Sequence, residues 1–447
     1  MTCACGLPLD WVDTFIADIK SQVFLRRTDH LLILLPNQSY RLNPAGFRIM
    51  EALVAGKKLS DLFPLDRLPE NIRTDLYHFF IGVVAMVKGC LGEGRDRPEV
   101  ETVPYEPPFL SLPILSEIAV TYRCNLACHF CYAGCTGIPK SHEMSLPEII
   151  TVLRKIRREA EVPSVSLTGG EPTLRPDLPE IVAAAKAEGM RVNLISNGTL
   201  ISDALAQTLV AAGLDSAQIS IEGPSAEIHD RLTGIPGSFA QTLSGLATMR
   251  RTGISVHTNT TISHGNLSAL PHMPAFVKTL EMTRFSMNMI IPSALIQKCY
   301  PELLVKYRDI GPVVQNLRDI SRREGIRFLW YSPTPYCLFN PIAHNLGNKG
   351  CAACDGLLSI TPAGEIIPCS SFFEPQGSLL DKPFAELWQG PEACHIRNKE
   401  RAPASCRSCD QFSLCEGACP LYWNVMGEDE LTAPSPSCCP GGEHGLV

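Results

Sequence analysis

Three cysteines lie close together in the stretch "CNLACHFC", in which Cys124, Cys128 and Cys131 have the spacing C-x3-C-x2-C. Cysteine thiolates in a short loop bind zinc or an iron–sulfur cluster, and closed sites of both kinds usually use four ligands. Three thiolates on a [4Fe–4S] cube leave one iron with an open position, and an open position makes a metal site catalytic. His129 or Cys135 could instead provide a fourth ligand and close the site.

A second group of cysteines lies near the end of the chain, where most of the 19 cysteines follow residue 330. Their spacing is C-x9-G-x4-C, then C-x2-C-x5-C-x3-C, and then an adjacent pair. Disulfides do not persist in a reducing cytosol, so clustered cysteines there are expected to bind metal. This region is also rich in Pro and Gly and can bury little apolar surface, so bound metal should stabilise its fold.

Glycine and small polar residues follow the predicted strands in the middle of the chain. The stretch "TGGEP" (168–172) follows one strand, "ISNGT" (195–199) the next, and "SIEGPS" (220–225) the one after. Glycine lets the backbone approach a ligand closely, and Ser and Asn side chains can hydrogen-bond a ribose. The alternative interpretation is structural, because the same residues form strand-to-loop turns and Asx turns.

Alternating strand and helix signals across residues 109–330 predict the scaffold that positions these loops. Ser145 and Glu148 form a capping box at the start of one predicted helix. The fold class is therefore α/β, with a partial (β/α)6 TIM barrel whose site lies at the C-terminal ends of the strands. The six expected strands are "EIAVTYR", "SVSLTGG", "RVNLIS", "AQISIEG", "SVHTNTTI" and "RFSMNMI".

Two further regions flank the barrel. Residues 1–108 contain two short strands in "HLLILLPNQSYRLN", a helix capped by Asn43, a second helix and a charged, Pro-rich linker. This pattern predicts a small winged-helix-like α+β domain. Residues 331–447 lose the strand–helix rhythm and form the cysteine-rich iron–sulfur domain.

Composition narrows the function classes. The net charge is −7, so the composition gives no sign of a basic face for nucleic acid or anionic membrane. The N-terminus "MTCACGLPLDWVD" lacks the features of a signal peptide, and the run "FFIGVVAMV" is too short to span a membrane. The expected location is the cytoplasm, with neither nucleic acid nor membrane as a partner.

The C-x3-C-x2-C loop, with Phe130 before the last cysteine, resembles the radical S-adenosylmethionine (SAM) superfamily. The resemblance implies that the open iron binds SAM and that an electron from the cluster cleaves SAM to a 5′-deoxyadenosyl radical, which abstracts hydrogen from substrate. It also implies a set of cofactor contacts, matched motif by motif: Phe130, Gly169, Gly170, Glu171, Ser196, Asn197, Ser220 and Arg231, with Asn259 and Thr260 as weaker candidates.

This sequence departs from the superfamily pattern in the loop after the fourth strand. Glu222 replaces the usual Asp, and Thr233 stands where an Arg is common. Arg231 is close enough in sequence to substitute for that Arg. The polar contacts that this loop makes with SAM are therefore the least secure part of the resemblance.

The C-terminal cysteines resemble the SPASM domain, which carries two auxiliary [4Fe–4S] clusters. The resemblance assigns Cys354, Cys369 and Cys419 to the first cluster, with Cys351 favoured over Cys337 as the further ligand. It assigns the second cluster to Cys406, Cys409 and Cys415, closed by Cys438 or Cys439. Sulfatase-maturing members carry an Asp after the second SPASM cysteine; here Ser370 follows Cys369, which argues against that reaction.

The front domain resembles the peptide chaperone of pyrroloquinoline quinone biosynthesis, a recognition element for ribosomally made, modified peptides. The shared stretch is "LLILLPNQSYRLNPAGFRIMEALVAGKKLSDLF". In that family a leader peptide adds as a strand to the sheet edge. The first hypothesis is therefore an enzyme that modifies a ribosomal peptide, with an external electron donor such as flavodoxin or ferredoxin. The alternatives are a maturase of a small-molecule or metal cofactor (modified haem or tungstopterin) and a non-catalytic iron–sulfur electron carrier or peptide-binding protein.

Overall fold

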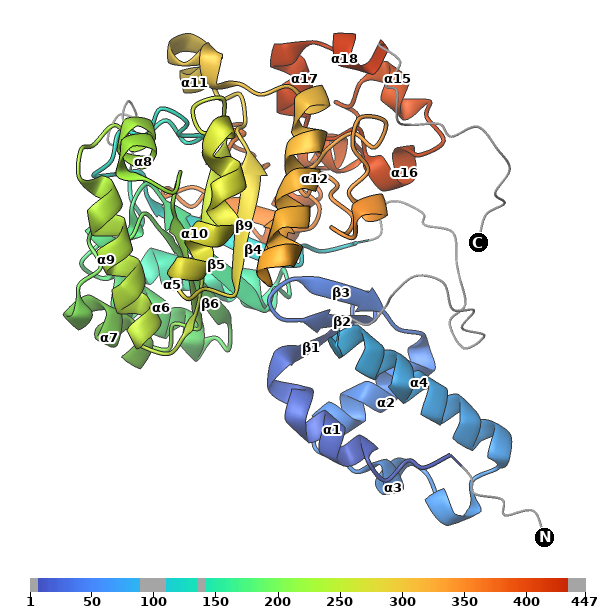
Figure 1. The fold of residues 1–447 in the computed structure, drawn as a ribbon. Helices are drawn as coiled ribbons and strands as arrows, with labels where there is room; N and C mark the ends of the chain where they lie inside the picture. Colours follow the sequence, from blue (N-terminus) through green and yellow to red (C-terminus); the bar gives the residue numbers. More distant parts are fainter. Residues whose placement is uncertain (1–6, 89–109, 136–141, 433–447) are drawn as a thin grey trace. The chain divides into compact units, whose positions relative to one another are not determined.

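The computed structural model describes residues 7–88, 110–135 and 142–432. The chain divides into two compact units, Met1–Ile114 and Leu115–Val447. Figure 1 shows the first unit in blue and the second in the colours from teal to red.

The first unit combines a three-stranded antiparallel sheet, in the order β1-β2-β3, with four α-helices among its described residues. Both faces of the central strand are buried: Leu32 and Leu34 pack on the helices, and Leu31 and Ile33 pack on Leu110 and Ile114. The elements are α1 (Val12–Ile19), β1 (Val23–Arg26), β2 (Leu31–Leu34), β3 (Gln38–Arg41), α2 (Pro44–Val54), α3 (Leu59–Leu62) and α4 (Glu70–Lys88).

Local chemistry explains two features of this unit. Asn43 caps α2 as expected, because its side chain accepts a hydrogen bond from the Gly46 N–H at 2.7 Å. The Arg26 side chain is fully buried and donates to Asp29 and to the carbonyl oxygens of Leu112 and Pro113. The short strand β1, which contains Arg26, was not predicted from the sequence.

The second unit is built on a nine-stranded sheet with the order β10-β9-β8-β7-β6-β5-β4-β11-β12. All six predicted strands are present, and neighbours from β4 to β10 pair in parallel. The strands are β4 (Leu115–Thr121), β5 (Ser164–Gly169), β6 (Arg191–Ser196), β7 (Ser216–Ser220), β8 (Ser255–Ile262), β9 (Arg284–Met289), β10 (Arg327–Trp330), β11 (Leu357–Ile360) and β12 (Ile366–Ile367).

Helices of the second unit cover the outer face of this sheet (Figure 1). The predicted capping box is present, because Ser145 and Glu148 bond each other's backbone at the start of α5. The barrel helices are α5 (Leu146–Arg158), α6 (Leu178–Ala187), α7 (Asp203–Ala211), α8 (Ala226–Thr233), α9 (Ser238–Arg251), α10 (Met273–Thr279), α11 (Ala294–Cys299) and α12 (Tyr307–Glu324).

The C-terminal region continues the barrel sheet. Strand β11 pairs in parallel with β4, from Leu357 opposite Leu115 to Ile360 opposite Ile118, and β12 returns antiparallel to it. This extension was not predicted, because the strands are short and lie among cysteines and turns. Short helices follow: α13 (Phe384–Trp388), α14 (Pro391–Arg397), α15 (Ala404–Arg407), α16 (Phe412–Cys415), α17 (Pro420–Met426) and α18 (Asp429–Thr432).

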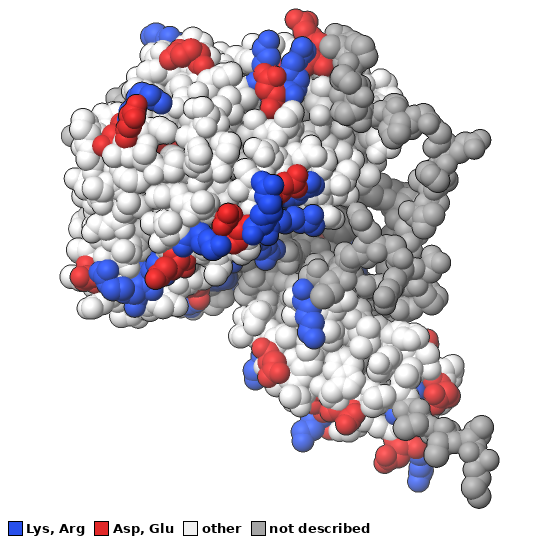
Figure 2. Space-filling view, viewed as in Figure 1, with Lys and Arg blue, Asp and Glu red and all other residues white. Residues whose placement is uncertain are grey.

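Two properties of the second and first units concern apolar helix length and surface charge. Within the described ranges, every helix is too short or too polar to cross a membrane. On the face shown in Figure 2, Lys and Arg side chains form a band in which Asp and Glu side chains are interspersed.

Candidate active site

The C-x3-C-x2-C loop follows β4 directly and is held at the barrel rim by the end of α8. The N–H groups of Ala127 and His129 donate to the carbonyl oxygens of Thr233 and Leu232 at 3.0 and 2.9 Å. The next residue, Gly234, has a φ of 73°, and a Cβ there would lie 2.7 Å from the Ala127 oxygen. Thr233, which replaces a common Arg, is buried and anchors this contact.

The three thiols of the loop influence one another electrostatically, as neighbouring cluster ligands would. Burial raises the pKa of Cys124 to about 11 and, together with the charges of Cys131 and Glu222, raises that of Cys128. The Cys135 thiol donates to the Cys131 sulfur, and that hydrogen bond lowers the pKa of Cys131 to about 6. The Leu126 N–H also points at the Cys124 sulfur, at 3.4 Å. This donor set fits an iron–sulfur cluster.

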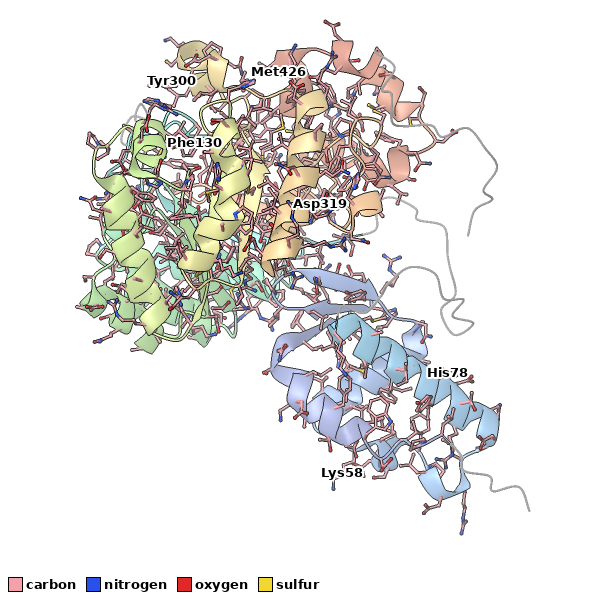
Figure 3. All side chains as sticks on the ribbon, in the orientation of Figure 1. Lys58, His78, Phe130, Tyr300, Asp319 and Met426 are labelled. Carbon is pink, nitrogen blue, oxygen red and sulfur yellow. The ribbon has the colours of Figure 1, made fainter. Side chains whose placement is uncertain are left out.

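The two alternative fourth ligands have different environments. The His129 ring stacks on Tyr300 with a centroid distance of 4.3 Å. Cys135 lies beside Cys131 and keeps its proton, because donation to the Cys131 thiolate raises its pKa. Phe130 packs with Tyr300 on an apolar cluster of the α8 and α11 region, and Figure 3 labels both residues there. Phe130 therefore supports the loop.

The "TGGEP" loop lies against the backbone that precedes the cysteines. Gly170 N–H donates to the Thr121 oxygen and Glu171 N–H to the Arg123 oxygen, both at 2.8 Å. A Cβ on Gly169 would lie 2.1 Å from the Thr121 oxygen, and one on Gly170 would lie 2.3 Å from the Arg123 oxygen. The two glycines thus allow a backbone approach that sets the position of Cys124.

Glu171 forms a buried bridge between two of the predicted cofactor loops. Its carboxylate accepts hydrogen bonds from Thr173 N and Oγ1, from the Ser196 hydroxyl at 2.8 Å and from the Asn197 N–H at 2.8 Å. Asn197 Nδ2 in turn donates to Asn125 Oδ1 in the cysteine loop at 3.0 Å. The sequence predicts Glu171, Ser196 and Asn197 as direct SAM contacts, and in the structure their hydrogen bonds connect the three loops to one another.

The loop after β7 carries the remaining predicted contacts. Ser220 ends β7 and pairs with Asn259 of β8. Arg231 is exposed on α8 and donates to the Gly265 oxygen at 2.8 Å. Glu222 is buried, accepts from the Thr261 N–H at 2.9 Å, and its burial raises its pKa to about 8.

The weaker candidates also make defined contacts. Asn259 Nδ2 donates to Asn288 Oδ1 at 2.7 Å, and the Thr260 hydroxyl donates to the Ile221 oxygen at 2.6 Å. Thr260 is fully buried. The Asn259 side chain belongs to the polar face of the sheet described next, whereas Thr260 lies on its opposite face.

Sequence reasoning missed the polar inner face of the barrel. On each strand, buried aliphatic residues alternate with polar residues. The polar residues of neighbouring strands lie side by side and form hydrogen bonds from one strand to the next. An alternating pattern such as "RVNLIS" could have revealed them. They are Glu117, Ser166, Asn193, Ser216, Gln218, His257, Asn259, Ser286 and Asn288.

One carboxylate of this face lies near the C-terminal domain. Glu117 Oε1 accepts hydrogen bonds from the Ser359 hydroxyl at 2.6 Å and from the Ser370 hydroxyl. Ser370 is the residue that follows Cys369. Sulfatase-maturing members carry an Asp at the position of Ser370. In this chain, Ser370 instead donates a hydrogen bond to the carboxylate of Glu117.

The cysteines assigned to the first auxiliary cluster come together. Burial and the charges of Cys351 and Cys419 raise the pKa of Cys369, and the Cys354 thiol also lies within the electrostatic range of Cys351. Gln376 Nε2 points at the Cys354 sulfur at 3.4 Å. The four thiols, brought from separate parts of the chain, fit a [4Fe–4S] cube, whereas Cys337 lies elsewhere, near Cys406.

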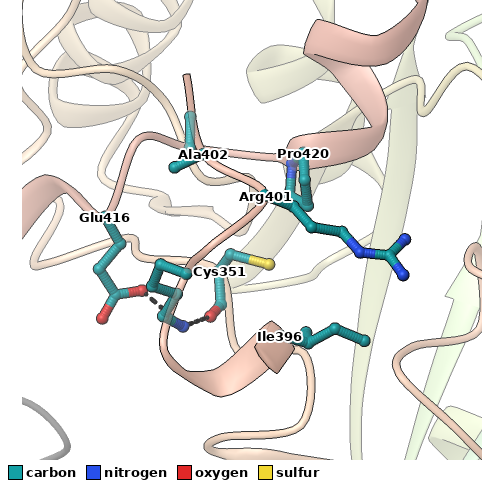
Figure 4. A pocket seen from close by; sticks show the side chains of 8 residues that line it. Cys351, Ile396, Arg401, Ala402, Glu416 and Pro420 are labelled. Carbon is teal, nitrogen blue, oxygen red and sulfur yellow. Dashed lines mark hydrogen bonds and ion pairs between the residues drawn. The ribbon is translucent and has the colours of Figure 1, made fainter. Parts of the chain in front are cut away.

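A half-buried lysine, Lys399, lies beside Cys351 and was not predicted. Lys399 Nζ contacts Glu416 at 2.9 Å and Asp355 at 3.2 Å, and it donates to the Cys351 oxygen. Figure 4 shows this pocket, whose lining includes Cys351, Lys399 and Glu416. The lysine holds the Cys351 backbone against the 416 loop.

The cysteines of the second auxiliary cluster are only partly described. Cys406, Cys409 and Cys415 lie within electrostatic range of one another, and Gln411 N–H points at the Cys409 sulfur at 3.5 Å. Cys438 and Cys439 lie outside the described residues. Across the described ranges, no three His, Cys, Asp or Glu side chains surround a single metal ion; in a cube, each thiolate binds a different iron.

Comparison with known proteins agrees with these features. Residues 118–267 match the radical SAM superfamily, and residues 351–410 match SPASM, an iron–sulfur cluster-binding domain. The chain is 27% identical over 338 residues to an AdoMet-dependent heme synthase of Nitratidesulfovibrio vulgaris, covering 70% of this chain and 89% of the relative. It is 28% identical over 362 residues to a PqqA peptide cyclase of Ruegeria pomeroyi, covering 79% and 92%.

Two solved structures share the fold. Streptococcus suis SuiB bound to the precursor peptide SuiA has a TM-score of 0.64 at 17% identity, covering 90% of this chain and 95% of SuiB. Native anSMEcpe with bound AdoMet has a TM-score of 0.56 at 18% identity, covering 69% and 89%.

The fold and the site together define an iron–sulfur enzyme built on a partial barrel, with a three-thiolate loop at the rim and a cysteine-rich domain behind it. The chain is a radical SAM enzyme with a C-terminal SPASM domain. Its cofactors are SAM, a [4Fe–4S] cluster in the barrel and auxiliary iron–sulfur clusters in the SPASM domain.

Proposed function

We propose that this enzyme modifies a ribosomal peptide by hydrogen abstraction and captures the leader of that peptide on its N-terminal unit. The three thiolates of the barrel loop would hold the cluster, and one electron from it, used to cleave SAM, supplies the hydrogen-abstracting radical. An external flavodoxin- or ferredoxin-like donor is part of the proposal. The oxidoreductase-like chemistry would take place inside the barrel.

The observation that carries the proposal is the edge strand of the N-terminal unit. Strand β3 (Gln38–Arg41) pairs only with β2 in the described sheet, and both of its end residues are exposed. An exposed edge presents backbone N–H and C=O groups to which an extended peptide can add as a strand. SuiB, whose fold covers 90% of this chain, was solved with a precursor peptide, which agrees with a peptide as the substrate.

The polar inner face of the barrel supports a hydrophilic substrate. Cross-strand pairs such as Asn193–Ser216 at 2.7 Å and Gln218–His257 at 3.1 Å place amide, hydroxyl and imidazole groups on this face. A peptide backbone that is buried needs hydrogen-bond partners for its N–H and C=O groups. The amide and hydroxyl groups of this face can provide them. A peptide therefore suits this interior better than a porphyrin.

A second candidate, maturation of a haem-type cofactor, is favoured by the relatives that are AdoMet-dependent heme synthases. The two candidates can be separated with the anaerobically reconstituted full chain. We would incubate it with SAM and a reductant, adding either the deuterated small-peptide fraction of the host or iron coproporphyrin III. We expect a mass change in one peptide, and transfer of its deuterium into 5′-deoxyadenosine.

Two variants test the role of the edge strand. Consecutive strand residues point their N–H groups to opposite sides, so Ser39→Pro and Tyr40→Pro each remove one N–H, one facing β2 and one facing outward. Of the two variants, the one that loses the outward-facing N–H should keep the circular dichroism spectrum of the wild-type protein and lose peptide turnover. A change in iron coproporphyrin III, with no peptide modified, would overturn the proposal in favour of cofactor maturation.

A further inference from the structure

We infer that Cys337 is the fourth thiolate of the second auxiliary cluster, completing the set of Cys406, Cys409 and Cys415. This assignment adds an upstream residue to a site that the SPASM motif alone would close with Cys438 or Cys439. It concerns the iron–sulfur framework and holds whichever substrate the enzyme takes.

The position of Cys337 relative to the other three thiols carries the inference. The N–H of Tyr336, the residue before Cys337, donates to the Cys415 sulfur at 3.3 Å. The Cys406 thiol lies within electrostatic range of both Cys337 and Cys409, and Cys415 lies within range of Cys409. The turn that contains Cys337 is therefore in contact with the cysteine group at two points.

That turn is held by hydrogen bonds within the chain itself. The N–H groups of Leu338 and Phe339 both donate to the Pro335 oxygen at 2.9 Å, which forms a tight turn around Cys337. Tyr336 is 5% exposed, and its hydroxyl donates to Asn348 Oδ1 at 2.6 Å. A cluster ligand needs a backbone held in this way, because its sulfur must meet an iron at a fixed distance.

Solvent exposure is consistent with a cluster at the domain surface. Cys337 and Cys409 are exposed, Cys406 is half-buried and Cys415 is buried. An N–H donor aimed at the Cys415 sulfur is the kind of contact that tunes an iron–sulfur cluster. The same kind of contact occurs in the other two cysteine groups, where Leu126 and Gln376 point at Cys124 and Cys354.

The test uses the full chain with Cys124, Cys128 and Cys131 changed to Ala, so that only the auxiliary clusters remain, at about eight irons. In this background we would compare Cys337→Ala, Cys337→Asp, the double variant Cys438→Ala/Cys439→Ala, and Cys299→Ala as an exposed control outside the cysteine groups. Each protein is reconstituted anaerobically and analysed for iron, sulfide and electron paramagnetic resonance.

We expect Cys337→Ala to lose about four irons, or to give the signal of a [3Fe–4S] cluster before reduction. Cys337→Asp should retain the cluster with a changed potential, because a carboxylate can still bind iron. The control and the double variant should keep about eight irons. Full retention in Cys337→Ala, or loss of a cluster in Cys438→Ala/Cys439→Ala, would overturn the assignment. Circular dichroism of Cys337→Asp separates ligand loss from misfolding.

Discussion

Replacement of Gly170 by alanine tests how the cysteine loop is positioned. The added Cβ would lie 2.3 Å from the Arg123 oxygen and 2.8 Å from the Arg123 carbonyl carbon, both of them backbone atoms. Because backbone atoms cannot rotate aside as a flexible side chain can, the two segments must separate. The separation weakens the hydrogen bonds from Gly170 N–H and Glu171 N–H, each 2.8 Å long.

The magnitude follows from these contacts. Two backbone hydrogen bonds contribute about 1 kcal/mol each, and overpacking costs about 1–3 kcal/mol. The lower entropy of the unfolded alanine chain offsets up to about 1 kcal/mol. The free energy of unfolding should therefore fall by about 2–4 kcal/mol. Since Arg123 directly precedes Cys124, the displacement should also impair SAM binding at the cluster.

The assay compares Gly170→Ala with Gly82→Ala in the full, anaerobically reconstituted chain. A Cβ on Gly82, in α4, meets nothing within 4 Å, so this control should be neutral or slightly stabilising. Gly170→Ala should melt roughly 3–6 °C lower, since the melting shift per kcal/mol is small in a unit as large as Leu115–Val447. It should also lose both the SAM-induced change in the paramagnetic spectrum and 5′-deoxyadenosine formation. A Gly170→Ala protein with wild-type melting and wild-type SAM response would refute the packing argument.

Three other perturbations probe the rest of the molecule. Arg26→Met leaves the buried Asp29 side chain without its arginine partner, which lowers the free energy of unfolding by about 3–5 kcal/mol. Amide hydrogen exchange in residues 7–88 should therefore accelerate by two to four orders of magnitude. Unchanged exchange would contradict this prediction. Burial and the nearby Arg284 and Arg191 lower the pKa of His257 to about 4. The folded state then loses up to roughly 3 kcal/mol as the pH falls from 6.5 to 4, and in His257→Gln this slope of stability against pH should flatten. Gln376→Leu removes an N–H donor from the Cys354 sulfur, so redox titration should find a lower reduction potential for one auxiliary cluster, with iron content retained.

The sequence was informative where a residue type has one main use. The spacing of Cys124, Cys128 and Cys131, and of the SPASM cysteines, predicted cofactor chemistry that the family comparisons confirm. Strong alternation of strand and helix signals likewise predicted the six central strands, and the cap at Asn43 was read correctly. The assignment of individual cluster ligands remains a prediction.

Long-range contacts could not be predicted from the sequence. The bridge from Glu171 to Ser196 and Asn197 depends on which side of a loop each hydroxyl and N–H faces. The approach of Cys337 to Cys406 joins segments about 70 residues apart, and the half-buried Lys399 pairs with Glu416 through a turn of irregular backbone. Local propensity carries no information about such pairings, because tertiary packing decides them.

The pairing of β11 with β4 affects how the chain can fold. The two strands come from residues 242 positions apart, as the Ser359–Glu117 contact shows, so this part of the sheet is a contact of high contact order and is expected to form late. Until it forms, the barrel ends in an unpaired edge at β4, which is a template for aggregation. A chain cut before residue 357 would expose that edge permanently. The SPASM segment is therefore a protective cover for the barrel sheet as well as a holder of cofactors.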